Sequence, residues 1–107
     1  MRQGYTAVGA DVEMQSEFER LTAEWKRETA HLSSPTMIAE HWAYKGVVKM
    51  GSDAIPWILR DLQGAPALWF MALREITGEL PIRSEDRGNI EAMRAAWLDW
   101  GVRNEFI

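Results

Sequence analysis

The sequence predicts a single all-α domain, folded as a compact bundle of about five helices. Apolar residues recur at steps of three and four along most of the 107 residues, which is the spacing of one helix face. Glycine, proline and serine interrupt this periodicity at short intervals, and no stretch of useful length has the pattern of a strand. A chain of this length forms one domain and buries a core without a metal or disulfide.

The first predicted helix covers residues 11–31. Acidic residues lie in its early turns and basic residues near its end, as the helix dipole favours. Its apolar stripe is formed by Met14, Phe18, Leu21 and Trp25. The ten residues before it have two glycines and no periodicity. We therefore expect a flexible N-terminal arm over residues 1–10 and the helical domain over residues 11–107.

A serine followed by Pro35 predicts the start of a second helix, because serine caps a helix and proline fits its first position. An unbroken helix to Met50 would spread its apolar residues around the whole circumference, so we expect a bend near residues 40–41. Gly51 is the expected C-terminal cap, and Ser52 the next N-terminal cap.

Three further helices complete the predicted bundle. The helix over about 53–63 buries one apolar face and ends at Gly64. Its face is formed by Ile55, Ile58, Leu59 and Leu62. The next helix opens at Pro66 and is apolar almost all the way round, which is typical of a central helix. Residues 77–81 close it, and the last helix runs from Ile90 to about residue 102.

Composition and charge disfavour several classes of function. Sixteen acidic against twelve basic side chains give a net charge of −4, the wrong sign for holding nucleic acid or an anionic membrane. The absence of cysteine removes a thiol nucleophile and the usual zinc ligands. No apolar stretch approaches the roughly 20 residues that span a bilayer, and no signal peptide is recognisable. We expect an unprocessed, cytoplasmic protein.

The six tryptophans divide into two groups. Four lie on apolar stripes or in the all-apolar helix and are expected in the core: Trp25, Trp69, Trp97 and Trp100. Trp42 and Trp57 point away from the apolar faces of their helices. Either the first helix or the N-terminal arm covers these two rings, or one or both anchor a partner. The predicted partner-binding residues are Trp42, Trp57, Tyr44 and Asp61.

Catalytic and metal-binding patterns are weak. His41 stands beside Glu40, but adjacent helix positions do not face each other, so a capping or hydrogen-bonding role is expected for this histidine. The sequence has no HExxH motif, nucleophile elbow or phosphate-binding loop. Carboxylates flank Pro81 without the alternation of an EF-hand, and solvated turn carboxylates are expected there. We predict no enzymatic activity, no cofactor and no metal.

A set of short motifs resembles a family of short bacterial helical proteins. The set consists of His41-x-Ala43-Tyr44, Met50-Gly51, Ala54-Ile55-Pro56-x-Ile58-Leu59, Trp69-Phe70-x-Ala72-Leu73, Ile76-Thr77-Gly78-Glu79, Arg87-Gly88 and Ala96-Trp97-x-x-Trp100-Gly101. Trp42 departs from the family, in which proline is more usual at that place. The family has no assigned activity; some members are encoded beside a second small protein, so the resemblance implies a partner or inhibitor role. The corner over residues 50–59 also resembles that of HEAT repeats, which implies stacked helix pairs.

The sequence thus favours a small non-enzymatic interaction module, an inhibitor, antitoxin-like or adaptor protein. It would bind a partner protein, encoded by an adjacent gene, through an aromatic and acidic surface. The alternatives are a helix-turn-helix-like regulator that binds nucleic acid, which the Gly51-Ser52 turn suggests, and a hydrolase that uses His41. Self-association through the tryptophan surface is a further alternative.

Overall fold

The structure is a computed structural model that describes the backbone of residues 2–64 and 68–107, and side chains from Val12 onward. Every regular element in these ranges is helical, which confirms the all-α prediction. In chain order they are α1 (Arg2–Thr29), α2 (Pro35–Ala39), α3 (Trp42–Met50), the 3-10 turn η1 (Gly51–Ala54), α4 (Ile55–Gly64), α5 (Phe70–Thr77), the 3-10 turn η2 (Ser84–Asp86) and α6 (Ile90–Arg103).

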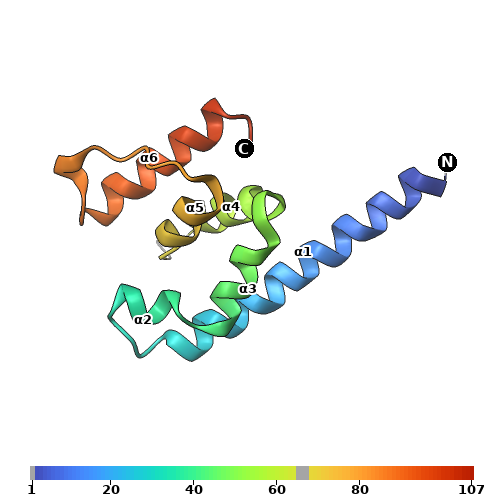
Figure 1. The fold of residues 1–107 in the computed structure, drawn as a ribbon, viewed down its shortest axis with the longest axis horizontal. Helices are drawn as coiled ribbons and strands as arrows, with labels where there is room; N and C mark the ends of the chain where they lie inside the picture. Colours follow the sequence, from blue (N-terminus) through green and yellow to red (C-terminus); the bar gives the residue numbers. More distant parts are fainter. Residues whose placement is uncertain (1, 65–67) are drawn as a thin grey trace.

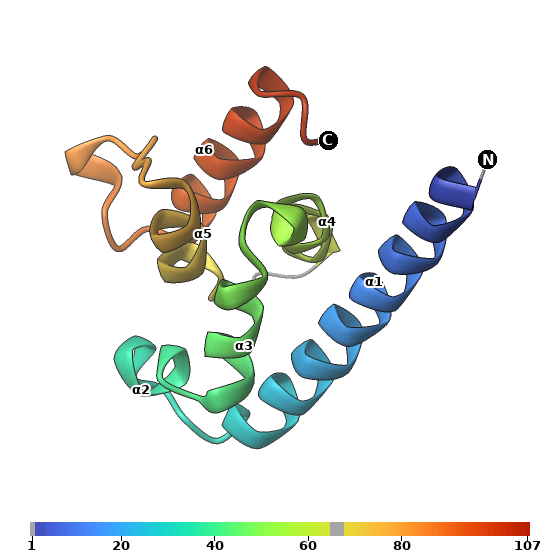
Figure 2. The same ribbon diagram turned by 45° about the vertical axis from the view of Figure 1, so that its right-hand side comes forward.

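The helices pack in neighbouring pairs around one core. The long helix α1 runs along α3, α3 lies against α5, and α4 lies against α6, as Figures 1 and 2 show. The short helix α2 turns the chain between the end of α1 and the start of α3. An extended link, residues 78–89, joins α5 to α6 and contains η2.

The first helix is longer at its N-terminus than the sequence predicts. The backbone is helical from Arg2, so residues 2–10 of the expected arm continue α1, and the helix ends at Thr29. Two glycines each lower helix propensity by about 1 kcal/mol but do not stop a helix that is already nucleated. Contrary to the expectation from the sequence, the two glycines therefore do not mark the start of the helix.

The break between α2 and α3 lies where the sequence predicts it. The Ser34 hydroxyl accepts a hydrogen bond from the Met37 N–H and caps α2, and the chain leaves the helix at residues 40–41. Gly51 caps α3 with φ of +70°, which glycine adopts at little cost. The predicted cap at Ser52 is wrong, because η1 leads directly into α4 and the Ser52 carbonyl, not its hydroxyl, accepts the Ile55 N–H.

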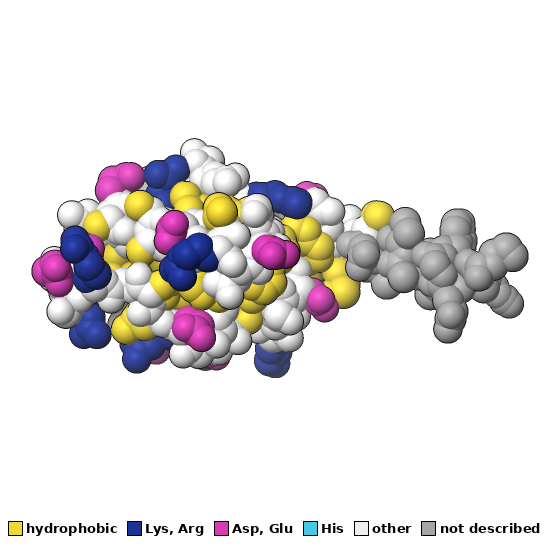
Figure 3. Space-filling view, turned by 90° about the horizontal axis from the view of Figure 1, so that it is seen from above, with side chains coloured by type: hydrophobic (Ala, Val, Ile, Leu, Met, Phe, Trp, Pro, Cys, Tyr) yellow, Lys and Arg dark blue, Asp and Glu magenta, His cyan; other side chains and the backbone are white. Residues whose placement is uncertain are grey.

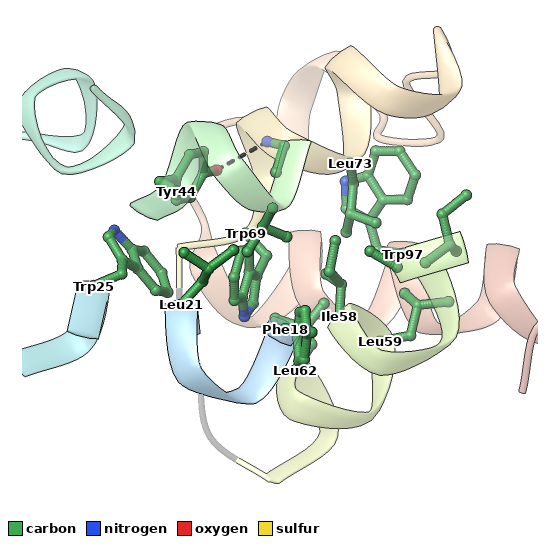
Figure 4. Packing of buried hydrophobic residues seen from close by; sticks show 14 of the residues in the cluster. Phe18, Leu21, Trp25, Tyr44, Ile58, Leu59, Leu62, Trp69, Leu73 and Trp97 are labelled. Atoms are coloured by element: carbon green, nitrogen blue, oxygen red, sulfur yellow. Dashed lines mark hydrogen bonds between the residues drawn. The ribbon is translucent and has the colours of Figure 1, made fainter. Parts of the chain in front are cut away.

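The core is built around aromatic rings, as the sequence predicts for four tryptophans. Trp69 lies at its centre, with ring centroids 4.5 Å from Trp25, 5.4 Å from Tyr44 and 5.8 Å from Phe18 (Figure 4). Trp97 is buried as well, in α6. Aromatic pairs at these separations add to the stabilisation that burial itself gives.

The expectation of a fully surrounded helix at α5 is only partly right. Trp69, Ala72 and Leu73 are buried, whereas Met71 is 48% exposed. The helix begins at Phe70, and the predicted start at Pro66 lies outside the described residues. The neighbouring helices cover the side of α5 that carries Ala72 and Leu73 and leave Met71 exposed on another side.

Candidate functional site

Trp42 is the most exposed aromatic side chain among the residues whose side chains are described. It is the first residue of α3, and 55% of its surface is accessible. Trp57, the other indole expected off the core, is half-buried, because Phe18 of α1 lies over it with ring centroids 5.8 Å apart. The first helix therefore covers Trp57 but leaves Trp42 open.

His41 fixes the backbone from which Trp42 projects. Its Nδ1 accepts a hydrogen bond of 3.1 Å from the Ala43 N–H, so His41 is the N-cap of α3. Its Nε2 lies 2.6 Å from Oε1 of Glu28 in α1. Since Nδ1 acts as an acceptor, Nε2 carries the proton and donates to the carboxylate. This arrangement confirms the capping and hydrogen-bonding role expected for His41.

The carboxylate of Glu28 is held in its charged form at this place. The hydrogen bond from His41 is the largest cause that lowers the pKa of Glu28 below its usual value of 4.5. The side chain of Glu40 is exposed one residue before His41. We call Trp42, Glu28 and Glu40 the Trp42 surface: one exposed indole, the Glu28 carboxylate that bonds the neighbouring His41, and exposed Glu40, two residues before Trp42 in the sequence.

Tyr44 does not belong to an accessible surface, contrary to its prediction as a partner-binding residue. It is 2% exposed, its hydroxyl donates to the Leu68 carbonyl at 3.0 Å, and it accepts from the Ala72 N–H at 2.8 Å (dashed line in Figure 4). Burial raises the pKa of this phenol, which keeps it neutral. Its ring faces the core because α3 packs against both α1 and α5.

Asp61 is likewise engaged inside the chain. One carboxylate oxygen accepts the Trp69 indole N–H at 2.7 Å, and the other pairs with the Lys26 ammonium at 2.8 Å. These contacts tie α4 to α5 and α1, so Asp61 has a structural role in this fold. Of the four residues predicted to bind a partner, only Trp42 is freely accessible.

Two acidic residues of the link, Glu85 and Asp86, form ion pairs within the turn. Arg83 contacts Asp86 at 3.0 Å and Glu85 at 3.5 Å. The described part of the chain holds no group of three or more side chains suited to a metal ion.

Two contacts that the sequence did not suggest connect distant segments. Arg94 of α6 donates to the carbonyls of Leu62 and Gln63 at 2.6 Å each and so caps the end of α4. Glu28 reaches His41 across 13 residues. Neither contact could be predicted from the spacing of residues within one helix, because each depends on how two helices pack against each other.

Charge does not single out another site on the face drawn in Figure 3. There, acidic and basic side chains are interspersed between patches of hydrophobic side chains. Comparison of the chain with protein-family models, curated proteins and solved structures finds no match. Among the described helices, none combines the length and apolar character needed to cross a membrane.

Proposed function

We propose that this protein is a non-enzymatic interaction module that binds a partner protein through the Trp42 surface. The observation that carries the proposal is the exposure of Trp42, at 55%, in a fold that covers its other five indoles wholly or in part. Tryptophan combines a large apolar ring with an indole N–H donor, so an exposed tryptophan can give a partner both apolar contact and a hydrogen bond.

The position of Trp42 suits an anchor residue. The ring projects from the first turn of α3, where His41 fixes the backbone by capping, so little conformational freedom is lost on docking. Tryptophan is enriched among residues that dominate interface energies, with losses of about 2 kcal/mol or more on truncation. The indole thus suits the centre of a small interface.

The acidic character of the surroundings favours a basic partner. Glu28 bonds to His41, the residue before Trp42, and Glu40 stands two residues before Trp42 in the sequence. The stretch from Asp11 to Glu28 has six acidic against three basic side chains. Complementary charge at the rim of an interface speeds association and sets specificity. This chemistry supports an inhibitor, antitoxin-like or adaptor role towards a protein with a basic binding face, encoded beside this one.

The alternative functions find less support. The helix after the Gly51 turn, α4, buries its apolar face and has Arg60 as its one cationic residue, which is poor for phosphate contacts. Both ring nitrogens of His41 are engaged in hydrogen bonds, so no lone pair is free to act as a general base.

Affinity capture from the cells that make this protein tests the proposal. Wild type and Trp42→Ala are compared, with Val102→Ala as the matched control because Val102 is an exposed apolar side chain on α6. We expect a defined partner with wild type and Val102→Ala, and loss of about 30-fold or more in affinity with Trp42→Ala.

Circular dichroism of each variant shows whether it is folded. A folded Trp42→Ala protein that retains every partner at full affinity contradicts the proposal. Sedimentation of the wild type measures self-association, and retention of labelled DNA at low salt would favour the regulator instead.

A further inference from the structure

A second feature of the surface is an apolar hollow of about 220 Å³ between α5, α6 and the link that joins them. Phe70 of α5, Leu80 and Ile82 of the link, and Met93 of α6 form its walls. A neighbouring hollow of about 260 Å³ shares Phe70 and Met93 with it and is lined almost wholly by apolar side chains. Each hollow is smaller than the roughly 300 Å³ at which ligand pockets begin, so only a small ligand suits the site.

The charged side chains that line the first hollow are all cationic. They are Arg74 of α5 and Arg87 of the link, both exposed, and no carboxylate lines this hollow. Neither arginine makes an ion pair with another described residue. The nearby carboxylates of Glu85 and Asp86 form ion pairs with Arg83 instead. Two guanidinium groups at the edge of an apolar hollow are therefore available to an anion.

The indole of Trp97 also lines this hollow and carries an unused donor. The ring is fully buried, and its Nε1 has no hydrogen-bond partner among the described residues. A buried N–H without a partner is unusual in a folded protein. Because the ring lines the hollow, the Trp97 indole N–H signal can report whether the hollow is occupied.

From these observations we infer that the hollow binds a small apolar carboxylate, of which a medium-chain fatty acid is the simplest member. The apolar walls take the hydrocarbon, and Arg74 and Arg87 take the carboxylate. A cationic or neutral amphiphile of equal length would contact the same apolar walls but would not form ion pairs with Arg74 and Arg87. This site is independent of Trp42, and its binding function goes beyond the proposed one.

Titration with three ten-carbon probes tests the inference: decanoate, decanol and decylamine. Binding is measured by calorimetry and by nuclear magnetic resonance of the indole N–H signals, below the micelle concentration of the charged probes and the solubility limit of decanol. We expect saturable decanoate binding, with the Trp97 indole signal shifted and that of Trp25 unchanged, because the Trp25 N–H is bonded to the Ile38 carbonyl. Decanol and decylamine should bind at least about tenfold more weakly.

A paired variant tests the role of the arginines. Arg74→Gln with Arg87→Gln should weaken decanoate binding about tenfold or more, whereas Arg60→Gln with Arg103→Gln removes the same charge elsewhere and should not. Equal binding of the three probes, an unshifted Trp97 signal, or full affinity in the Arg74 and Arg87 variant would overturn the inference. None of these results depends on whether Trp42 binds a protein.

Discussion

The contact between Glu28 and His41 shows how one side-chain pair supports the backbone that carries an exposed aromatic residue. Both groups act on the backbone that carries Trp42: His41 caps α3 through Nδ1, and Glu28 orients the imidazole through Nε2. The carboxylate also contributes negative charge beside the indole. A single pair therefore supports both the placement of the aromatic ring and its acidic surroundings.

This pair makes part of the stability dependent on pH. His41 lowers the pKa of Glu28 below 4.5 in the folded protein. Such a group stabilises the fold above its unfolded pKa, and the contribution is lost as the pH falls through the folded pKa. We expect a double-mutant cycle of Glu28→Gln and His41→Asn to show coupling in urea unfolding at about pH 6 that disappears toward about pH 3.

The design of this cycle keeps the helix cap intact, because asparagine at position 41 retains a side-chain oxygen that can accept the Ala43 N–H. The control cycle pairs His41→Asn with Glu40→Gln, which should show no coupling, since neighbouring residues do not face each other. A Glu28 coupling that stays constant down to the lowest pH would contradict the assignment.

At the scale of the elements, α5 lacks a capping side chain of its own. Trp69 precedes the helix and makes no cap hydrogen bond, and Tyr44 from α3 takes this role by accepting the Ala72 N–H at 2.8 Å. The same hydroxyl donates to the Leu68 carbonyl. The first turn of α5 is thus capped by a residue 28 positions before Ala72 in the chain.

Tyr44→Phe tests this cap. The ring and its packing on Trp69 are retained, but the buried Ala72 N–H loses its acceptor, so the free energy of unfolding should fall by about 1–3 kcal/mol. Urea denaturation measures the change. Ser52→Ala, at an exposed serine that does not cap a helix, should change it by less than about 0.5 kcal/mol. Equal stability of the two variants would show that α5 does not need the hydroxyl.

The same contacts explain how far sequence patterns could predict this fold. Periodicity and local capping placed the break before α3, the glycine caps and the buried face of α4, because those signals lie within a few residues. The prediction of Tyr44 as a partner-binding residue would require an accessible side chain, and Tyr44 is buried. Its burial depends on the crossing of three helices, which no local pattern records.

At the scale of the whole molecule, Asp61 joins three helices that are distant in the sequence. Its two oxygens connect Lys26 of α1 and Trp69 at the start of α5 to α4. The Trp69 ring is fully buried, so its N–H depends on this carboxylate for a hydrogen bond. The pair with Lys26 is partly exposed, with side-chain accessibilities of 41% for lysine and 24% for aspartate.

Two substitutions separate these contributions. Asp61→Asn keeps an oxygen for the indole and loses only the ion pair, at a cost of about 0–1 kcal/mol in unfolding free energy. Asp61→Ala leaves the Trp69 N–H without an acceptor and should cost about 1–3 kcal/mol. Thermal and urea unfolding of both variants check the order. A smaller loss for alanine than for asparagine would exclude the role given to the indole bond.

Three of the bonds between distant segments start from aromatic side chains: the Trp25 indole to the Ile38 carbonyl, the Tyr44 hydroxyl to the Leu68 carbonyl, and the Trp69 indole to Asp61. Volume alone therefore does not decide what can replace these rings. Phenylalanine keeps an aromatic ring at each position but has no polar hydrogen to donate, so the Ile38 carbonyl, the Leu68 carbonyl or the Asp61 carboxylate would lose one of its hydrogen bonds. Fewer residue types should therefore be tolerated at these three positions than at Ile58 or Leu73, where the buried side chain makes only apolar contacts.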